Sequence, residues 1–415
     1  RHRGRQGQLL ASRSPRVSLV SPVYGVAPYL PRFLDSLSAQ DHPHDRLQVV
    51  LVLDGACDDS PSICRTWAAA TDIDALVIET GNGGQGRARN LALARADGSW
   101  IGFPDPDDWI APDFLTRLLS SRTRGDVLLA GRTIIHQDGR GTTHPLDFRF
   151  QDGTVRVDAA RQPQAIQLSV HECLIRGKEA RSARFPEDRE APTFEDALYL
   201  GHIRSGNQWI TCVPDAVYHY EKRSSGDSAV QTAWSRPGRY TTQLRTRYQP
   251  YLDVTGGAAW AQQTILYDLG WYMGVVDRGQ MPAEPDGLGA EHAALMRDLV
   301  LTLDTHQILR SPWGHLSAAA RARMILWHGA PEVAIVRDGA VTELYTADAR
   351  SREAKPAEYA GALVGYHVTG REAERLYPGG DTPRVPIWPR RPAGGCRWRP
   401  YRVSCCASTA LATHV

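Results

Sequence analysis

Short apolar runs alternate with segments of helical periodicity through the first quarter of the chain. The apolar runs, each rich in Val, Leu or Ile, occur at residues 16–25, 47–54, 74–79 and 99–103. Between the first two runs, apolar side chains recur at the spacing of one helix face, at Leu30, Phe33, Leu34 and Leu37. Strands that alternate with helices predict an α/β fold, with a three-layer α/β/α arrangement around a mainly parallel sheet.

The alternation weakens after Asp138. A helix is predicted from Phe194 to Ser205 and a strand over "WITCVPDAVYHY" at 209–220, and several segments of helical periodicity follow. "EVAIVRDGAVTELYT" at 332–346 predicts a hairpin that turns at Asp338 and Gly339. The predicted organisation is a basic tail at 1–15, an α/β domain at 16–232, a mostly helical accessory region at 233–328, a small β-containing region at 329–385 and a disordered basic tail at 386–415.

Composition narrows the class of protein. With 415 residues, 42% of them hydrophobic, the chain can bury two or three cores. The formal charge of +2 gives no reason to expect nucleic acid as a partner, so charged ligands must be recognised by local sites. The seven cysteines form no CxxC pair, so neither a disulfide framework nor a zinc site is expected, and a reducing cytosolic setting fits best. The sequence carries no signal for an oligomeric state.

The termini and hydropathy predict a cytoplasmic protein. The start, "RHRGRQGQLLASRSPR", is basic but lacks the apolar core of a signal peptide, and no run of about 18 apolar residues occurs anywhere. A disordered tail is the favoured interpretation of the arginine-rich start. Contact with the anionic inner face of the cell membrane is the alternative.

Two neighbouring motifs carry candidate chemistry. In "GNGGQGRARN" at 81–90, a glycine-rich turn would let a phosphate approach the backbone, although an ordinary strand-to-helix loop has the same composition. In "DPDDW", Asp105, Asp107 and Asp108 follow directly on a predicted strand. Adjacent carboxylates repel one another unless a cation neutralises them, and Mg²⁺ or Mn²⁺ bound jointly with a diphosphate suits such oxygen ligands.

Taken in order, the segments 17–40, 49–60 and 81–115 resemble the N-terminal half of glycosyltransferase family 2, whose members have the GT-A fold. A further motif, "FEDALYL" at 194–200, is similar to the Glu-Asp motif of that family. The resemblance covers about Val17 to Tyr220, roughly half of the chain. Four motifs occur in the order that the family has, and a chance agreement of all four is improbable.

The resemblance implies a donor site and a metal site. Residues that would contact the sugar nucleotide are Pro22, Tyr24, Asp54, Gly84, Arg89, Asn90, Asp105, Lys222 and Arg223. Asp54 would contact the base, although the family usually has two acids where this chain has Leu53 and Asp54. Metal ligands implied by the resemblance are Asp107, Asp105 and His219.

The resemblance also implies a catalytic pair, Glu195 and Asp196, with Asp196 as the base. A second Glu-Asp pair, Glu187 and Asp188, lies just upstream in a loop rich in Pro and Arg. The apolar run that follows Glu195 and Asp196 favours the later pair, because a base must be held rigidly at a helix start.

These observations predict a metal-dependent inverting glycosyltransferase. The donor is predicted to be a nucleotide-diphospho-sugar, with UDP favoured because an Asp can accept from the imide N–H of uracil, and the cofactor Mn²⁺ or Mg²⁺. Segment 260–272 resembles enzymes of cell-wall and capsule polymer synthesis, so the predicted acceptor is a glycan or polyol-phosphate polymer, as in teichoic acid synthesis.

The sequence also bears on two other classes of function. A non-catalytic nucleotide- or glycan-binding module is the alternative, motivated by the acid missing before Asp54. A Rossmann dehydrogenase is excluded because the glycine-rich turn follows the third predicted strand and no G-x-G-x-x-G opens the first helix.

Overall fold

The computed structural model describes residues 14–223, 232–278 and 288–330, and beyond them only short strands. The N-terminal tail before Ser14 and nearly all of the predicted C-terminal tail lie outside the described residues. The chain divides into two compact units, Arg1–Ala261 and Gln262–Val415.

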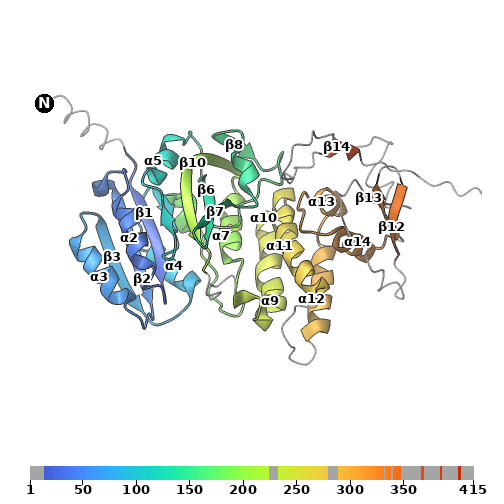
Figure 1. The fold of residues 1–415 in the computed structure, drawn as a ribbon, viewed down its shortest axis with the longest axis horizontal. Coiled ribbons are helices and arrows are strands. Elements are labelled where there is room, and N and C mark those ends of the chain that lie inside the picture. The colour runs from blue at the N-terminus through green and yellow to red at the C-terminus, as the bar shows by residue number, and fades with distance from the viewer. Residues whose placement is uncertain are drawn as a thin grey trace, which may run out of the picture. The chain divides into compact units, whose positions relative to one another are not determined.

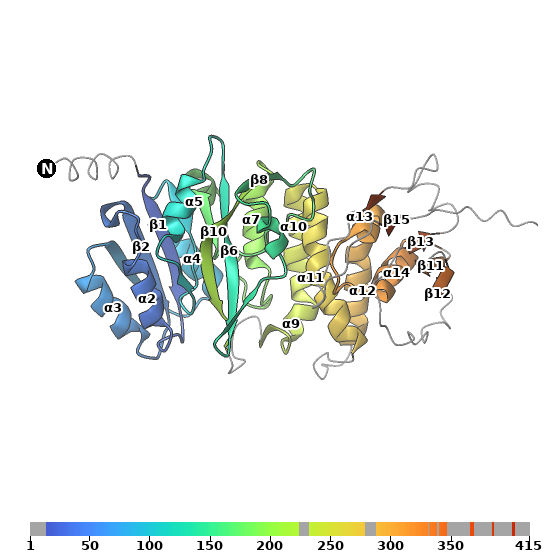
Figure 2. The same ribbon diagram turned by 45° about the horizontal axis from the view of Figure 1, so that its top comes forward.

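A sheet forms the centre of the first unit. Its leading strands are β1 (Val17–Val23), β2 (Leu47–Asp54), β3 (Asp74–Thr80) and β4 (Trp100–Gly102). They pair in parallel in the order β3-β2-β1-β4, and β1, β2 and β3 lie side by side in Figures 1 and 2. The predicted strands at the start of the chain are therefore confirmed.

Helices cover both faces of this sheet, because alternate residues of β2 point to opposite sides. Val49, Leu51 and Leu53 belong to one buried cluster, while Val50 and Val52 belong to the other. The first cluster also holds apolar side chains of α2 (Leu30–Ser38), α3 (Ser60–Ala70) and α5 (Phe114–Ser120). The second holds those of α4 (Gln85–Leu93) and α7 (Glu195–Arg204). The three-layer arrangement is confirmed.

The rest of the sheet mixes strand directions. The order continues from β4 through β9 (Cys173–Arg176), β6 (Leu128–Gln137) and β10 (Trp209–Glu221) to β5 (Trp109–Ile110). β9 runs antiparallel to both β4 and β6, whereas β6 and β10 are parallel. Two short strands, β7 (Arg140–Thr143) and β8 (Val155–Asp158), pair antiparallel with β6 and β10. Since β4, β6 and β10 all run in one direction, their carboxyl ends share one edge of the sheet.

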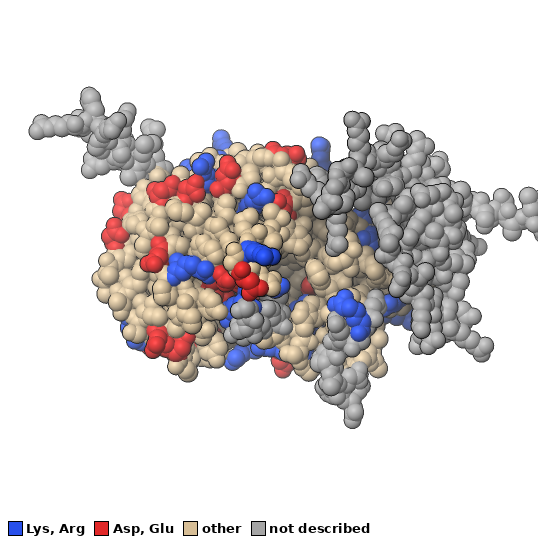
Figure 3. Space-filling view, viewed as in Figure 1, with Lys and Arg blue, Asp and Glu red and all other residues tan. Residues whose placement is uncertain are grey.

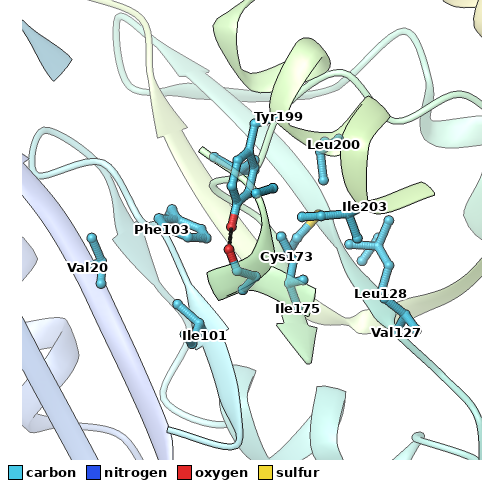
Figure 4. Packing of buried hydrophobic residues seen from close by; sticks show 14 of the residues in the cluster. Val20, Ile101, Phe103, Val127, Leu128, Cys173, Ile175, Tyr199, Leu200 and Ile203 are labelled. Carbon is cyan, nitrogen blue, oxygen red and sulfur yellow. Dashed lines mark hydrogen bonds between the residues drawn. The ribbon is translucent and has the colours of Figure 1, made fainter. Parts of the chain in front are cut away.

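Aromatic packing fixes α7 against the sheet. The rings of Phe185 and Tyr199 stack with centroids 3.9 Å apart, and Phe103, just beyond β4, meets Tyr199 edge-on at 5.5 Å. Figure 4 shows Tyr199 and Phe103 in this cluster, with the Tyr199 hydroxyl donating to the carbonyl of Ala180 at 2.8 Å. This bond satisfies the buried Tyr199 hydroxyl and links α7 to the segment before it. The first turn of α7 carries Glu195 and Asp196.

Helices follow the sheet, as predicted. In the first unit these are α9 (Pro237–Tyr240) and α10 (Gln249–Thr255), and α11 (Ala259–Asp277) crosses the division between the units. The predicted apolar face of α11, at Ile265, Leu269, Tyr272 and Met273, is buried.

The second unit contains α12 (Leu288–Leu301), α13 (Thr305–Arg310) and α14 (Ala318–Trp327). Strands β11 (Glu332–Arg337) and β12 (Ala340–Thr346) then pair antiparallel, which confirms the hairpin pairing. Among the described residues, every helix is too short or too polar to span a bilayer.

Candidate active site

The glycine-rich turn is fixed by Asp54 at the carboxyl end of β2. Its two carboxylate oxygens accept hydrogen bonds from the backbone N–H of Gly83 at 2.7 Å and of Gly84 at 2.8 Å. Gly84 has a φ of 89°, a backbone conformation that residues with a side chain rarely adopt, and it precedes the first residue of α4. Asp54 therefore shapes the turn; it is buried, and each of its oxygens keeps one further lone pair.

Arg89 is the centre of the acid cluster. Its guanidinium is buried, and its Nη1 donates to Oδ1 of Asp196 at 2.8 Å while Nη2 donates to Oδ1 of Asp105 at 2.9 Å. A carboxylate oxygen of Glu195 lies 3.5 Å from Nη1. The structure thus joins α4, the loop after β4 and the start of α7 through one side chain.

A strained residue sets the start of α7. Phe194 adopts a left-handed φ of 72°, unusual for a side chain of this size. Its ring packs edge-on against Tyr248 at 4.7 Å and Tyr251 at 5.3 Å, which holds the backbone in place. Strain of this kind concentrates at functional sites. Here it directs Glu195 and Asp196 toward Arg89.

Asp107 and Asp108 have different partners. Asp107 accepts a hydrogen bond from Nη2 of Arg223 at 2.8 Å. Asp108 is buried and accepts from the Tyr218 hydroxyl at 2.7 Å and from the backbone N–H of Glu221 at 2.8 Å. Asp108 thereby ties the acidic loop to β10, whereas Asp107 stays partly accessible.

Negative charge exceeds positive charge in this cluster. Five carboxyl groups face two guanidinium groups, those of Arg89 and Arg223; the carboxyl groups are Asp105, Asp107, Asp108, Glu195 and Asp196. Burial, with repulsion from neighbouring acids, raises the pKa of Asp107 and raises that of Glu195 to about 7. Burial also raises the pKa of Asp196, although the attraction of Arg89 opposes it.

The excess of carboxylates fits a divalent cation. Among the described residues, no three His, Cys, Asp or Glu side chains converge as a ready cage for a metal ion. Mg²⁺ and similar ions commonly use only one or two carboxylates and take their other ligands from phosphates and water. Asp107, with Asp105 beside it, supplies oxygen ligands of that kind, and a cation would relieve their repulsion.

The competing Glu-Asp pair lies outside the acid cluster. Asp188 forms an ion pair with Arg247, and Glu187 accepts from the side-chain amide of Asn90 at 2.9 Å. Asn90 also exchanges hydrogen bonds with the backbone of Phe185, so it braces the loop that leads to α7. Of the two Glu-Asp pairs, Glu195 and Asp196 alone contact Arg89 among the described residues.

The remaining predicted residues are spread around the cluster. His219 lies apart from the carboxylates: its Nδ1 is 2.9 Å from Nε2 of His136, and its ring stacks on Trp109 at 4.9 Å. Burial lowers the pKa of His219 to about 4. Tyr24 and Lys222 are exposed, and Pro22 is half-buried at the end of β1. A metal-binding role for His219 stays a prediction.

Two site residues were missed in the sequence. His171 places Nδ1 3.8 Å from a carboxylate oxygen of Asp105 and Nε2 3.2 Å from one of buried Glu172. The hydroxyl of Tyr218 accepts from the backbone N–H of Asp105 at 3.1 Å. A lone His in an irregular segment carries no pattern, but Tyr218 precedes His219 in a predicted strand and could have been found there.

Charged side chains of both signs are interspersed on the face of the molecule shown in Figure 3. This agrees with the near-neutral formal charge of the sequence. Recognition of an anionic ligand therefore depends on individual side chains rather than on a large field of one sign.

The sheet with its acidic loop at a strand end, joined through Arg89 to a second acidic pair, is an arrangement of the GT-A fold class. Residues 18–178 match the family model Glycosyl transferase family 2, so the chain contains a domain of glycosyltransferase family 2. The family and the fold predicted from the sequence are both confirmed.

Known relatives support this assignment. The chain is 26% identical to "Minor teichoic acid biosynthesis protein GgaB" of Bacillus subtilis (strain 168) over 71% of its own length and 33% of the relative. It is 39% identical to "Putative glycosyltransferase EpsH" of the same organism, over 50% of its own length and 61% of the relative. The chain thus spans between a third and three fifths of the length of these two relatives.

A solved structure shows the same fold. It is "Crystal structure of S. aureus TarS 1-349 in complex with UDP-GlcNAc", which is 20% identical and has a TM-score of 0.60. The likeness covers 76% of this chain and 87% of that one. At this identity the likeness is evidence for the fold alone.

Proposed function

We propose that this protein is a metal-dependent inverting glycosyltransferase that transfers a sugar from a UDP-sugar to a hydroxyl group of a polyol-phosphate or glycan acceptor. One observation carries the proposal: Arg89 binds Asp105 of the acidic loop and Asp196 at the start of α7 with the same guanidinium. The diphosphate end of a donor and the base for an acceptor are thereby held at one site.

Asp196 is the proposed base. In a single displacement the acceptor O–H proton passes to its carboxylate, the oxygen bonds to the anomeric carbon, and the bond from that carbon to the diphosphate breaks. Burial raises the pKa of Asp196, which makes it a stronger proton acceptor than an exposed Asp. The hydrogen bonds from Arg89 and from the backbone N–H of Val170 at 3.2 Å fix its orientation.

The donor is proposed to lie along the carboxyl ends of β1, β2 and β4. Asp54 and the glycine-rich turn that it orders would contact the uracil and ribose, and Arg223 would reach the diphosphate. Asp107, with Asp105, would hold Mn²⁺ or Mg²⁺. A cation bound there supplies charge neutralisation for the departing diphosphate.

The acceptor class rests on the relatives. The name of GgaB refers to teichoic acid biosynthesis. A further relative, "Poly(ribitol-phosphate) beta-N-acetylglucosaminyltransferase TarS" of Staphylococcus aureus (strain Mu50 / ATCC 700699), is 26% identical over 55% of this chain and 39% of its own length. We propose that the enzyme is cytoplasmic and works near the inner face of the cell membrane.

Replacing Asp107 by Asn tests the metal site. The amide removes the negative charge but keeps the size, so UDP affinity in the variant should no longer rise when Mn²⁺ is added, while the fold persists. Calorimetric titration of UDP with and without Mn²⁺ measures this. Asp113→Asn serves as the matched control, because Asp113 is partly exposed and pairs with Arg117 outside the acidic loop. Equal tightening by Mn²⁺ in the parent and in Asp107→Asn would remove Asp107 from the metal site.

A further inference from the structure

A second pocket lies at the edge of the sheet opposite the acid cluster. It has a volume of about 630 Å³, and its lining includes Trp100, Arg122, Thr123, Arg124, Gly125 and Arg176. Trp100 is the first residue of β4, whereas Asp105 lies beyond the last. The loop 121–127 leads into β6, which runs in the same direction as β4. This second pocket is therefore separate from the proposed donor site.

The lining of the second pocket is basic and contains no acidic residue. Within the described part of the chain, Arg124 is exposed and has no hydrogen-bond or ion-pair partner. Arg122 donates through Nη1 to the carbonyl of Leu119. Arg176 uses Nε and Nη2 on the carbonyl of Asp126, at 2.9 and 2.6 Å. A guanidinium has five N–H donors, so all three arginines retain donors for a ligand.

Buried contacts hold this loop in shape. Asp126 is buried, and one of its oxygens accepts from the N–H and the hydroxyl of Thr123, at 2.6 and 2.9 Å. Its other oxygen lies 2.9 Å from Nε of Arg156, so its charge is already compensated and does not cancel that of the pocket. The guanidinium carbon of Arg176 sits 5.2 Å from the ring centroid of Trp100. The arginines are thus presented by an ordered frame.

We propose that the second pocket binds the phosphate groups of a phosphodiester chain. Guanidinium groups bind phosphate oxygens through paired, charge-assisted hydrogen bonds, and several around one open pocket suit successive phosphates better than a single small anion. The role of this pocket rests on the proposed function: a polymer acceptor held here would raise the effective concentration of its end at the transfer site.

A lipid surface fits the second pocket less well. Peripheral membrane sites combine basic residues with exposed apolar side chains that enter the bilayer. Among the described residues the exposed large apolar side chains are Tyr24, Trp271 and Leu301, and none of them lines this pocket. The concave, polar lining favours a soluble polyanion.

The test measures binding of synthetic oligo(glycerol phosphate) to the full chain. Arg122→Ala with Arg124→Ala should weaken binding by about tenfold or more, because charge-assisted contacts to phosphate are the strong ones. Arg65→Ala with Arg161→Ala is the matched control: it removes the same charge from exposed positions elsewhere. UDP affinity with Mn²⁺ should be equal in all three proteins, which separates this proposal from the donor site.

Three outcomes would overturn the proposal. Equal weakening in the control pair would show general electrostatic attraction, and unchanged binding in the pocket variant would exclude the pocket. If the Arg122→Ala, Arg124→Ala variant lost binding to phosphatidylglycerol vesicles but still bound oligo(glycerol phosphate), the pocket would be assigned to a membrane. Binding of the oligomer that depends on Arg122 and Arg124 would support the pocket even if no sugar transfer were found.

Discussion

Replacing Asp196 by Asn is expected to lower the rate of sugar transfer by about 100-fold or more, the usual scale for loss of a positioned general base. The fold should persist, because Asn has the same shape and the guanidinium of Arg89 keeps Asp105 and Glu195 as partners. UDP affinity should be nearly unchanged, since Asp54 and Asp107 lie on the proposed donor side. Steady-state transfer and calorimetric UDP binding together measure the effect.

Asp188→Asn is the matched control for Asp196→Asn. It makes the same chemical change in the neighbouring Glu-Asp pair, at a residue whose partner is Arg247 rather than Arg89. Transfer per folded molecule should remain within a few fold of the parent. If Asp188→Asn were the inactive variant and Asp196→Asn retained transfer, the base would have been assigned to the wrong pair.

Arg89→Met is expected to destabilise the first unit by about 3–5 kcal/mol, the range found when one partner of a buried ion pair is removed. Burial alone would lower the pKa of Arg89, but the attraction of Asp196, Asp105 and Glu195 outweighs it and raises the pKa. Without the guanidinium, these buried carboxyl groups lose their shared counter-ion. Met has a similar length and apolar character, so the change tests charge rather than volume.

The control for Arg89→Met is Arg87→Met, two residues earlier on the same helix. Arg87 is half-buried, and within the described part of the chain its side chain donates only to the Thr80 hydroxyl and to the carbonyl of Gly81, at 3.3 and 3.2 Å. Its loss should cost about 1 kcal/mol or less. Urea unfolding followed by tryptophan fluorescence compares the two variants. A similar urea midpoint for the two variants would show that Arg89 does not stabilise the first unit through the acid cluster.

Apart from the two-residue β5, the strands and helices up to α5 were predictable because each has a complete local pattern. β2 is an unbroken apolar run, and α2 repeats its apolar residues at helical spacing. β9 has only four residues and reaches its place between β4 and β6 from some seventy residues downstream. Its position depends on pairing between distant segments, which no local pattern encodes. β6 was missed as well, because Gly131, Arg132 and Thr133 interrupt its apolar residues.

In the candidate site, too, the residues with a local motif could be predicted, whereas contacts between distant segments could not. Asp105, Asp107 and Asp196 were identified from motifs, and the structure brings Asp105 and Asp196 to one guanidinium. The contacts of His171 could not be inferred, because they depend on how the irregular segment before β9 folds onto Asp105. Sequence motifs located the acids together with Arg89 and Arg223, whereas the ion pairs between them became visible only in three dimensions.

The most direct test of a metal-dependent glycosyltransferase is the release of UDP from UDP-sugars by the full chain. Each donor is measured with Mn²⁺ and with EDTA, with and without a polyol-phosphate acceptor. We expect at least one UDP-sugar to be turned over with Mn²⁺, EDTA to abolish this turnover, and the acceptor to accelerate it. Tight, Mn²⁺-dependent binding of UDP-sugars without turnover of any of them would contradict it and would indicate a nucleotide-binding module instead.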